Sequence, residues 1–225
     1  EFLVLDRSND GSIAASVAAA RDGLRNVRDL VPLDLLEAVN AGHSAIGATS
    51  ARQLADQPAA REGPMLIIPP IKKARADWLV EKATELGVAS LQPVITEHTA
   101  IRDVNSERWR KITIEAAEQC ERLDLPLIEP LKPLPTLLAE WPQDEPLHVA
   151  VERAEAVSLP EAAAKATIRA IVIGPEGGFA PAELDQFTKL PFVQPVTLGP
   201  QVLRAETAAL AALAIVNASA LHSGS

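Results

Sequence analysis

Two short loops in the last third of the chain combine glycine and proline in a pattern typical of ligand binding. Gly174-Pro-Glu-Gly-Gly178 follows an apolar run that ends at Ile173, and a helical pattern begins soon afterwards at Pro181. Glycines at the carboxyl end of a strand let the backbone approach a ligand, and open α/β sheets bind ligands at that edge. Leu198-Gly199-Pro200 follows another apolar run and leads into Leu203-Arg-Ala-Glu-Thr-Ala208. We therefore expect a ligand site formed by the two loops.

The residue types present disfavour several other kinds of site. Neither loop matches the dinucleotide-binding fingerprint G-x-G-x-x-G or a phosphate loop that ends in Gly-Lys-Ser/Thr. The 225 residues include 4 histidines and 1 cysteine, Cys120, with no zinc-ligand spacing, so we expect no metal. A single cysteine cannot form an intramolecular disulfide and suits a reducing compartment, which predicts a cytoplasmic protein. No apolar run reaches the ~20 residues of a membrane span, and no signal peptide is recognised, so no membrane contact is expected.

The net charge of −9 conceals a locally basic stretch. Nucleic acids respond to local patches more than to the sum over a chain. The stretch contains Lys72, Lys73, Arg75, Lys82, Arg102, Arg108, Arg110 and Lys111, whereas acidic residues dominate beyond Glu140. A polyanion-binding face and an ordinary solvated helix surface both fit this segregation of charge.

The elements that must position the loops alternate in type. Short apolar runs predict strands at Met65–Ile68, Ser90–Ile95, Leu147–Val151 and Ile171–Ile173. Helical spacing predicts helices at Ala74–Leu86, Ser106–Leu123, Pro181–Leu190 and Leu203–His222, the second of them capped by Ser106. Alternation of this kind predicts an α/β domain over residues 64–225, with a parallel sheet covered on both faces.

Residues 1–63 differ from the rest in composition. They are rich in alanine, glycine, serine and aspartate, and turn signals break their apolar runs into short pieces. We interpret them as a separate, small, mostly β domain. The segment 61–64 is the predicted linker to the α/β domain.

The last predicted helix is apolar on every side between Ala208 and Val216. A helix of this kind is expected to be buried all round. Packing against its own sheet and against a second subunit would achieve that, so we expect a homodimer.

Several blocks of sequence, taken together with the two loops, resemble one known family. The blocks are Ile71–Lys73, Trp78–Gly87, Ile114–Gln119 with Arg122, Ile173–Phe179 and Leu198–Ala208. Over residues 64–225 the chain resembles the bacterial 16S ribosomal RNA uridine-N3 methyltransferases of the RsmE family, in the SPOUT superfamily. Gln201 departs from this pattern, because the family commonly has arginine there, and residues 1–63 match poorly.

The resemblance implies a fold, a cofactor and a set of partners. The fold would be a SPOUT-type α/β domain with a deep C-terminal trefoil knot, a rare exception to the rule against threading, preceded by a small PUA-like RNA-binding domain. The cofactor would be S-adenosylmethionine, and the active enzyme a homodimer acting on 16S rRNA in the small ribosomal subunit. The implied cofactor residues are Val151, Glu152, Ile173, Gly174, Glu176, Gly177, Gly178, Leu198, Gly199, Leu203, Arg204, Glu206, Thr207 and Ala208.

Methylation of uracil N3 would place further demands on the chain. The nitrogen must lose a proton, so we predict catalytic roles for Arg204, which would stabilise the anion, and for Glu206 or Glu152 as the base. N3 lies on the pairing edge, so the base must be unpaired or flipped out. The residues predicted to hold the RNA backbone are Lys72, Lys73, Arg75, Arg102, Arg110, Lys111 and Arg122.

Three alternative functions fit parts of the same sequence. A catalytically silent RNA-binding or ribosome-assembly factor could keep the knotted fold without the cofactor, although the intact glycine loops argue against it. A SPOUT methyltransferase could instead act on a ribose or on transfer RNA. An ordinary α/β nucleotide-binding enzyme is disfavoured, because both of its fingerprints are missing.

Overall fold

A parallel sheet forms the centre of the part of the chain that the computed structural model describes, residues 63–152 and 156–223. These residues belong to one unit, Ala60–Ser225. The predicted small β domain, residues 1–63, lies outside the described residues except for Gly63. No helix in the described ranges is long and apolar enough to cross a membrane.

The sheet is built from short strands, and every described pairing is parallel. Its order is β3-β2-β1-β7-β5-β8-β6, and β4 also pairs with β2. The strands are β1 (Met65–Ile68), β2 (Ser90–Ile95), β3 (Leu127–Ile128), β4 (Lys132–Pro133), β5 (Leu147–Ala150), β6 (Val157–Ser158), β7 (Ala170–Val172) and β8 (Val193–Thr197). The predicted parallel α/β arrangement is therefore confirmed, and β5 lies between β7 and β8.

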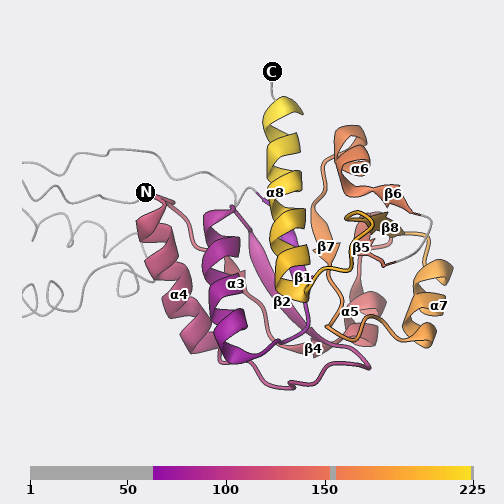
Figure 1. The fold of residues 1–225 in the computed structure, drawn as a ribbon, viewed down its shortest axis with the longest axis horizontal. Helices are drawn as coiled ribbons and strands as arrows, with labels where there is room; N and C mark the ends of the chain where they lie inside the picture. The colour runs from indigo at the N-terminus through magenta and orange to yellow at the C-terminus, as the bar shows by residue number, and fades with distance from the viewer. Residues whose placement is uncertain (1–62, 153–155, 224–225) are drawn as a thin grey trace, which may run out of the picture. The chain divides into compact units, whose positions relative to one another are not determined.

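Helices cover both faces of the sheet (Figure 1). They are α3 (Lys73–Glu85), α4 (Ser106–Gln119), α5 (Leu134–Glu140), α6 (Leu159–Lys165), α7 (Pro181–Lys189) and α8 (Ala205–Ser223). Leu66 and Ile68 of β1 pack with α3, α4, α6 and α8, whereas Ile67 between them packs with α5 and α7. This alternation follows from the two-residue period of a strand, and it explains why the buried strands are apolar throughout.

Most predicted elements are confirmed within one or two residues, but the ends of α4 were predicted wrongly. Asn105, and not Ser106, caps the helix, because its side-chain oxygen accepts the Arg108 amide at 2.9 Å. The helix ends at Gln119 and not at Leu123. Glu121 follows with a φ of 58°, a left-handed conformation that a helix cannot contain. The short helices α5 and α6 were not predicted.

Among the residues that the structure describes, helix α8 is buried on one side only. Figure 1 shows α8 beside α3 and in front of β1. Its buried apolar residues are Ala205, Ala208, Ala209, Ala212, Leu213 and Val216. Ala214 is exposed, and Ala211 is half-buried. The described residues alone therefore do not bury the helix on all sides, and they leave an apolar strip of its surface open.

Candidate functional site

A cavity of about 250 Å³ opens at the carboxyl edge of the sheet. The strand order brings three loops together there, namely those that follow β5, β7 and β8, and the start of α8 closes one side. Parallel strands end at the same edge, so their loops must meet. The volume lies just below the range of ~300–1,000 Å³ that is typical of ligand pockets.

Most of the cofactor residues predicted from the sequence line this cavity. They are Val151, Glu152, Ile173, Gly174, Gly177, Gly178, Leu198, Gly199, Leu203 and Ala208. The lining also includes residues that were not predicted as cofactor contacts, namely Ala150, Pro175, Phe179, Leu184, Pro200, Gln201, Val202 and Ala205. All of these except Leu184 lie within or beside the predicted segments, so position in the loops could have identified them. Leu184 comes from α7, where its spacing gave no sign of a ligand contact.

The loop after β7 leaves little space for a side chain at Gly174 or Gly177. A Cβ at Gly174 would lie 3.1 Å from the Phe179 ring, and one at Gly177 would lie 3.2 Å from the His98 Cβ. Gly178 has a φ of 69°, and its amide donates to the Pro175 carbonyl at 2.9 Å. The loop is a tight turn that presents its backbone to the cavity, as the sequence predicted.

The remaining predicted cofactor residues, Glu176, Arg204, Glu206 and Thr207, do not line the cavity. Glu206 is only 7% exposed, and its Oε1 lies 3.4 Å from the Nε of Arg75 on α3. Its Oε2 is buried and has no hydrogen-bond partner in the described part of the chain. Glu206 therefore joins the starts of α3 and α8. Arg204 is exposed, and its carbonyl accepts the Ala208 amide at 2.8 Å.

Glu152 supplies the charge in the cavity. It is exposed at the end of β5, and it is the only charged side chain among the described residues of the lining. Phe179, Leu198 and Leu203 add apolar surface to the same lining. A ligand that combines a cation with a flat apolar group would satisfy both features. No group of three or more potential metal ligands occurs among the described residues.

The predicted RNA-binding residues lie in two places. Lys72 and Lys73 are exposed at the start of α3, and Arg75 beside them is held by Glu206. This helix follows the carboxyl end of β1, so the three side chains lie at the same edge of the sheet as the cavity. Arg102 is exposed in the loop between β2 and α4, whereas Arg110 and Lys111 are exposed on α4 itself.

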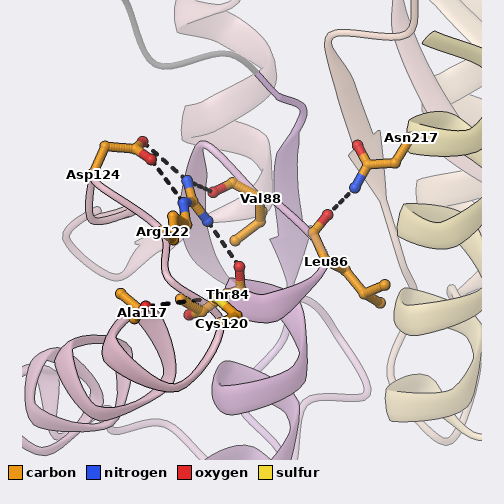
Figure 2. Close-up of polar contacts among 8 residues, drawn as sticks. All are labelled: Thr84, Leu86, Val88, Ala117, Cys120, Arg122, Asp124 and Asn217. Carbon is orange, nitrogen blue, oxygen red and sulfur yellow. Dashed lines mark hydrogen bonds and ion pairs between the residues drawn. The ribbon is translucent and has the colours of Figure 1, made fainter. Parts of the chain in front are cut away.

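Arg122, predicted as an RNA contact, uses its guanidinium within the fold. Figure 2 shows its guanidinium pointing at the end of α3, where it donates to the carbonyls of Thr84 (2.9 Å) and Val88 (2.7 Å). It also pairs with Asp124 at 2.8 Å, and its side chain is only 11% exposed. Asn217 of α8 donates to the Leu86 carbonyl nearby. Cations are favourable at helix carboxyl ends, so Arg122 serves to cap α3.

Comparisons with known proteins assign most of the described residues to a family. A family model described as an RNA methyltransferase domain matches residues 62–217. A second model, described as a predicted alpha-helical domain with a conserved ER motif, matches residues 1–111. The described part of that second match contains β1 and β2, so it does not form an all-helical domain.

Two curated relatives of this chain share the same name. Ribosomal RNA small subunit methyltransferase E of Rickettsia conorii is 34% identical over 159 residues, which cover 68% of this chain and 63% of the relative. The protein of that name from Bacillus subtilis is 31% identical over 65% of this chain and 62% of its own length. The chain thus spans less than two thirds of these relatives. A solved structure of the Neisseria gonorrhoeae protein, bound to S-adenosyl methionine, is 31% identical with a TM-score of 0.63, over 74% of this chain and 69% of that one.

Proposed function

Because this chain belongs to the RNA methyltransferase family, among relatives named ribosomal RNA small subunit methyltransferase E, we propose that it methylates N3 of a uridine in 16S rRNA with S-adenosylmethionine as methyl donor. The observation that carries this proposal is the cavity itself. Three loops converge on it, as the predicted cofactor site requires, and a relative of similar fold is solved with that cofactor.

The lining has the chemistry that S-adenosylmethionine requires. The cofactor supplies a methyl group already activated on a sulfonium. Backbone groups of the loop 174–178 and of Leu198 and Gly199 would bind its polar ends, and Leu203 and Phe179 would cover its adenine. The Glu152 carboxylate would face a positively charged ligand. Side chains at Gly174 and Gly177 would crowd Phe179 and His98, so the glycines let the loop keep the shape that lines the cavity.

Deprotonation of uracil N3 requires a base and a stabilising cation. Glu152 is the candidate base, since it is the carboxylate that lines the cavity, whereas Glu206 is buried against Arg75. Arg204 is the candidate cation, because it is exposed between the lining residues Leu203 and Ala205. The protein's main contribution would be to align N3 with the methyl group, which removes the entropic cost of bringing them together.

RNA would reach the cavity along the carboxyl edge of the sheet. Lys72, Lys73 and Arg102 are exposed there, and Arg75 lies beside them. Arg110 and Lys111 on α4 would extend the contact along the backbone. This arrangement would give an acidic chain of net charge −9 a local basic face.

The finer features of the fold and assembly belong to the same proposal. We expect the SPOUT-type knot, because the chain leaves β8 on one side of β5 and returns as α8 to pack against β1 and α3. The PUA-like RNA-binding domain is assigned to residues 1–63 and the methyltransferase domain to 64–225. We also expect a homodimer in the cytoplasm, with the open strip of α8 at the interface.

The test uses the full chain with small ribosomal subunits that lack the modification. Incubation with S-adenosylmethionine should produce N3-methyluridine at a single position, mapped by mass spectrometry of nuclease fragments. Glu152→Gln should lower the rate at least ~100-fold if it removes a general base, and Arg204→Ala should lower it by a similar factor. A protein that binds rRNA but not the cofactor in calorimetry would instead be the silent assembly factor. Methylation of a ribose or of transfer RNA would indicate the other SPOUT activity.

A further inference from the structure

Glu183 joins two loops that are far apart in the sequence. It lies in the first turn of α7 and is only 9% exposed. One carboxylate oxygen accepts the Ala180 amide at 2.8 Å, at the end of the loop that follows β7. The other accepts the Glu97 amide at 3.0 Å, in the loop that follows β2. Both oxygens of a buried carboxylate are thus used to hold two loops in one position.

His98 makes a second link between the same loops. Its Nδ1 lies 3.0 Å from the Gly178 carbonyl, and its Cβ lies beside Gly177. The turn that carries His98 is itself stiffened, because the Thr99 hydroxyl accepts the Thr96 amide at 2.8 Å and lies 2.7 Å from the Thr96 hydroxyl. The glycine loop is therefore tied to a rigid neighbour at both Gly178 and Ala180.

We propose that Glu183 and His98 are positioning residues of the cofactor site, which hold the loop 174–180 in the shape that receives S-adenosylmethionine. This inference rests on the function proposed above. Glycine-rich backbone is flexible when unsupported, so a ligand that binds mainly to that backbone must offset the cost of ordering it. The two links order the loop before the ligand arrives. Charge-assisted hydrogen bonds such as those of Glu183 are the stronger kind for this purpose.

The role of Glu183 goes beyond capping a helix. Glu161 occupies the same third helical position in α6, and its carboxylate pairs with Lys165 on the surface at 2.8 Å. A glutamate that served only as a cap would need the Ala180 contact alone. The contact with Glu97, from a loop outside α7, is the additional feature, and it connects the cofactor loop to the segment that carries Arg102.

The experiment compares Glu183→Gln with Glu161→Gln as its matched control. The amide keeps the size of the side chain but has one acceptor oxygen instead of two. We expect the Kd for S-adenosylmethionine to rise roughly tenfold in Glu183→Gln, measured by calorimetry, and to stay unchanged in Glu161→Gln. With saturating cofactor, kcat should stay within about twofold of the parent, because the reacting groups are intact. In the absence of ligand, hydrogen exchange at the Gly178 amide should be faster in Glu183→Gln than in the parent.

A pair of His98 variants tests the inference without depending on how Glu183→Gln folds. His98→Ala should weaken cofactor binding severalfold, whereas His98→Asn should restore it, because the amide can donate to the Gly178 carbonyl. Equal Kd values in the parent, Glu183→Gln and His98→Ala would overturn the inference. If the parent itself binds no cofactor, the proposed function fails. Hydrogen exchange at the Gly178 amide then still tests whether Glu183 and His98 hold the loop. An exchange rate that is the same in the variants and the parent would overturn the positioning role.

Discussion

Gly177 fits between the cavity and His98 because it has no side chain. The residue lines the cavity, and its backbone does not have a positive φ, so larger residues can adopt its conformation. Its neighbour His98 leaves only 3.2 Å for a Cβ. Glycine therefore matters here because a Cβ would crowd His98, and not because of backbone strain.

We therefore predict that Gly177→Val loses S-adenosylmethionine binding while the protein stays folded. A branched side chain would push against His98 and displace the loop that lines the cavity. Calorimetry should show a Kd at least ~100-fold weaker, about 2.7 kcal/mol, with an unchanged circular dichroism spectrum. Ala164→Val, on the exposed side of α6, is the control. Undiminished affinity in folded Gly177→Val would remove this cavity from consideration as the cofactor site.

His148 is a buried titratable residue that the proposed chemistry does not use. It is 3% exposed on β5, and its Nδ1 has no hydrogen-bond partner within the described residues. Burial lowers the pKa of the imidazole, and this effect outweighs hydrogen bonds with Ala170 and Gln194, which favour the charged form. The folded protein therefore holds His148 neutral at a pH where the unfolded chain would bind a proton.

The consequence is a loss of stability in mild acid. Stability from neutral His148 is complete above its ordinary pKa of ~6.5, and it declines as the pH falls further, by up to ~1.4 kcal/mol per pH unit. Urea unfolding at pH 7.5 and 5.5 should show this decline in the parent. In His148→Gln, the free energy of unfolding should fall less between pH 7.5 and pH 5.5 than in the parent. This difference does not depend on how stable the variant is at pH 7.5. The same pH dependence in both proteins would assign the effect to other groups.

The start of α3 is the element at which charge and cavity meet. Lys72 and Lys73 are exposed there, and the Arg75–Glu206 pair links this helix to the first turn of α8. Because Ala205 and Ala208 of α8 line the cavity, the link fixes the basic end of α3 relative to the site. The carboxyl end of α3 is held separately, by Arg122 and Asn217.

Reversing the charge at this end of α3 should weaken RNA binding selectively. Lys72→Glu with Lys73→Glu should reduce affinity and shallow the dependence of log K on log salt by about one unit for each phosphate that the variant no longer neutralises. Cofactor affinity should not change, since neither residue lines the cavity. Lys165→Glu is a suitable control, because α6 leads into the amino end of β7 and so lies at the opposite edge of the sheet. An unchanged salt slope would leave RNA recognition to other residues.

The open apolar strip of α8 bears on how whole molecules assemble. Ala214 and Ala218 are exposed on the same stripe of α8, and Ala211, one turn before Ala214, is half-buried. Trp78 on the adjacent helix α3 is 46% exposed as well. Exposed apolar surface of this kind is typical of an interface between subunits.

We predict that the protein is a dimer and that Ala214→Glu makes it monomeric. Light scattering at micromolar concentration should give twice the mass of the chain for the parent and a single mass for the variant. A two-fold axis would bring both new carboxylates to the same interface, and like charges placed together cost several kcal/mol. Ala164→Glu on α6 should remain dimeric. A monomeric parent that retains activity would contradict the prediction.

The sequence by itself determined the local features of this protein. Apolar runs and glycine-proline loops are local patterns, so the main strands, the main helices and the loops after β7 and β8 could be predicted. The carboxyl-edge position of the site followed from the parallel sheet. Two-residue strands and seven-residue helices were missed, because so few residues carry no clear period.

Only the tertiary structure decided which side of an element each residue faces and what it meets there. Glu206 lies between two cavity residues in the sequence, yet the turn of α8 directs it to Arg75. Arg122 is a cation like Lys72, but it is buried against the end of α3. The links from His98 to Gly178 and from Glu97 to Glu183 join residues 80 or more positions apart. Such contacts depend on the strand order, in which β1 separates β2 from β7, and no local pattern specifies that order.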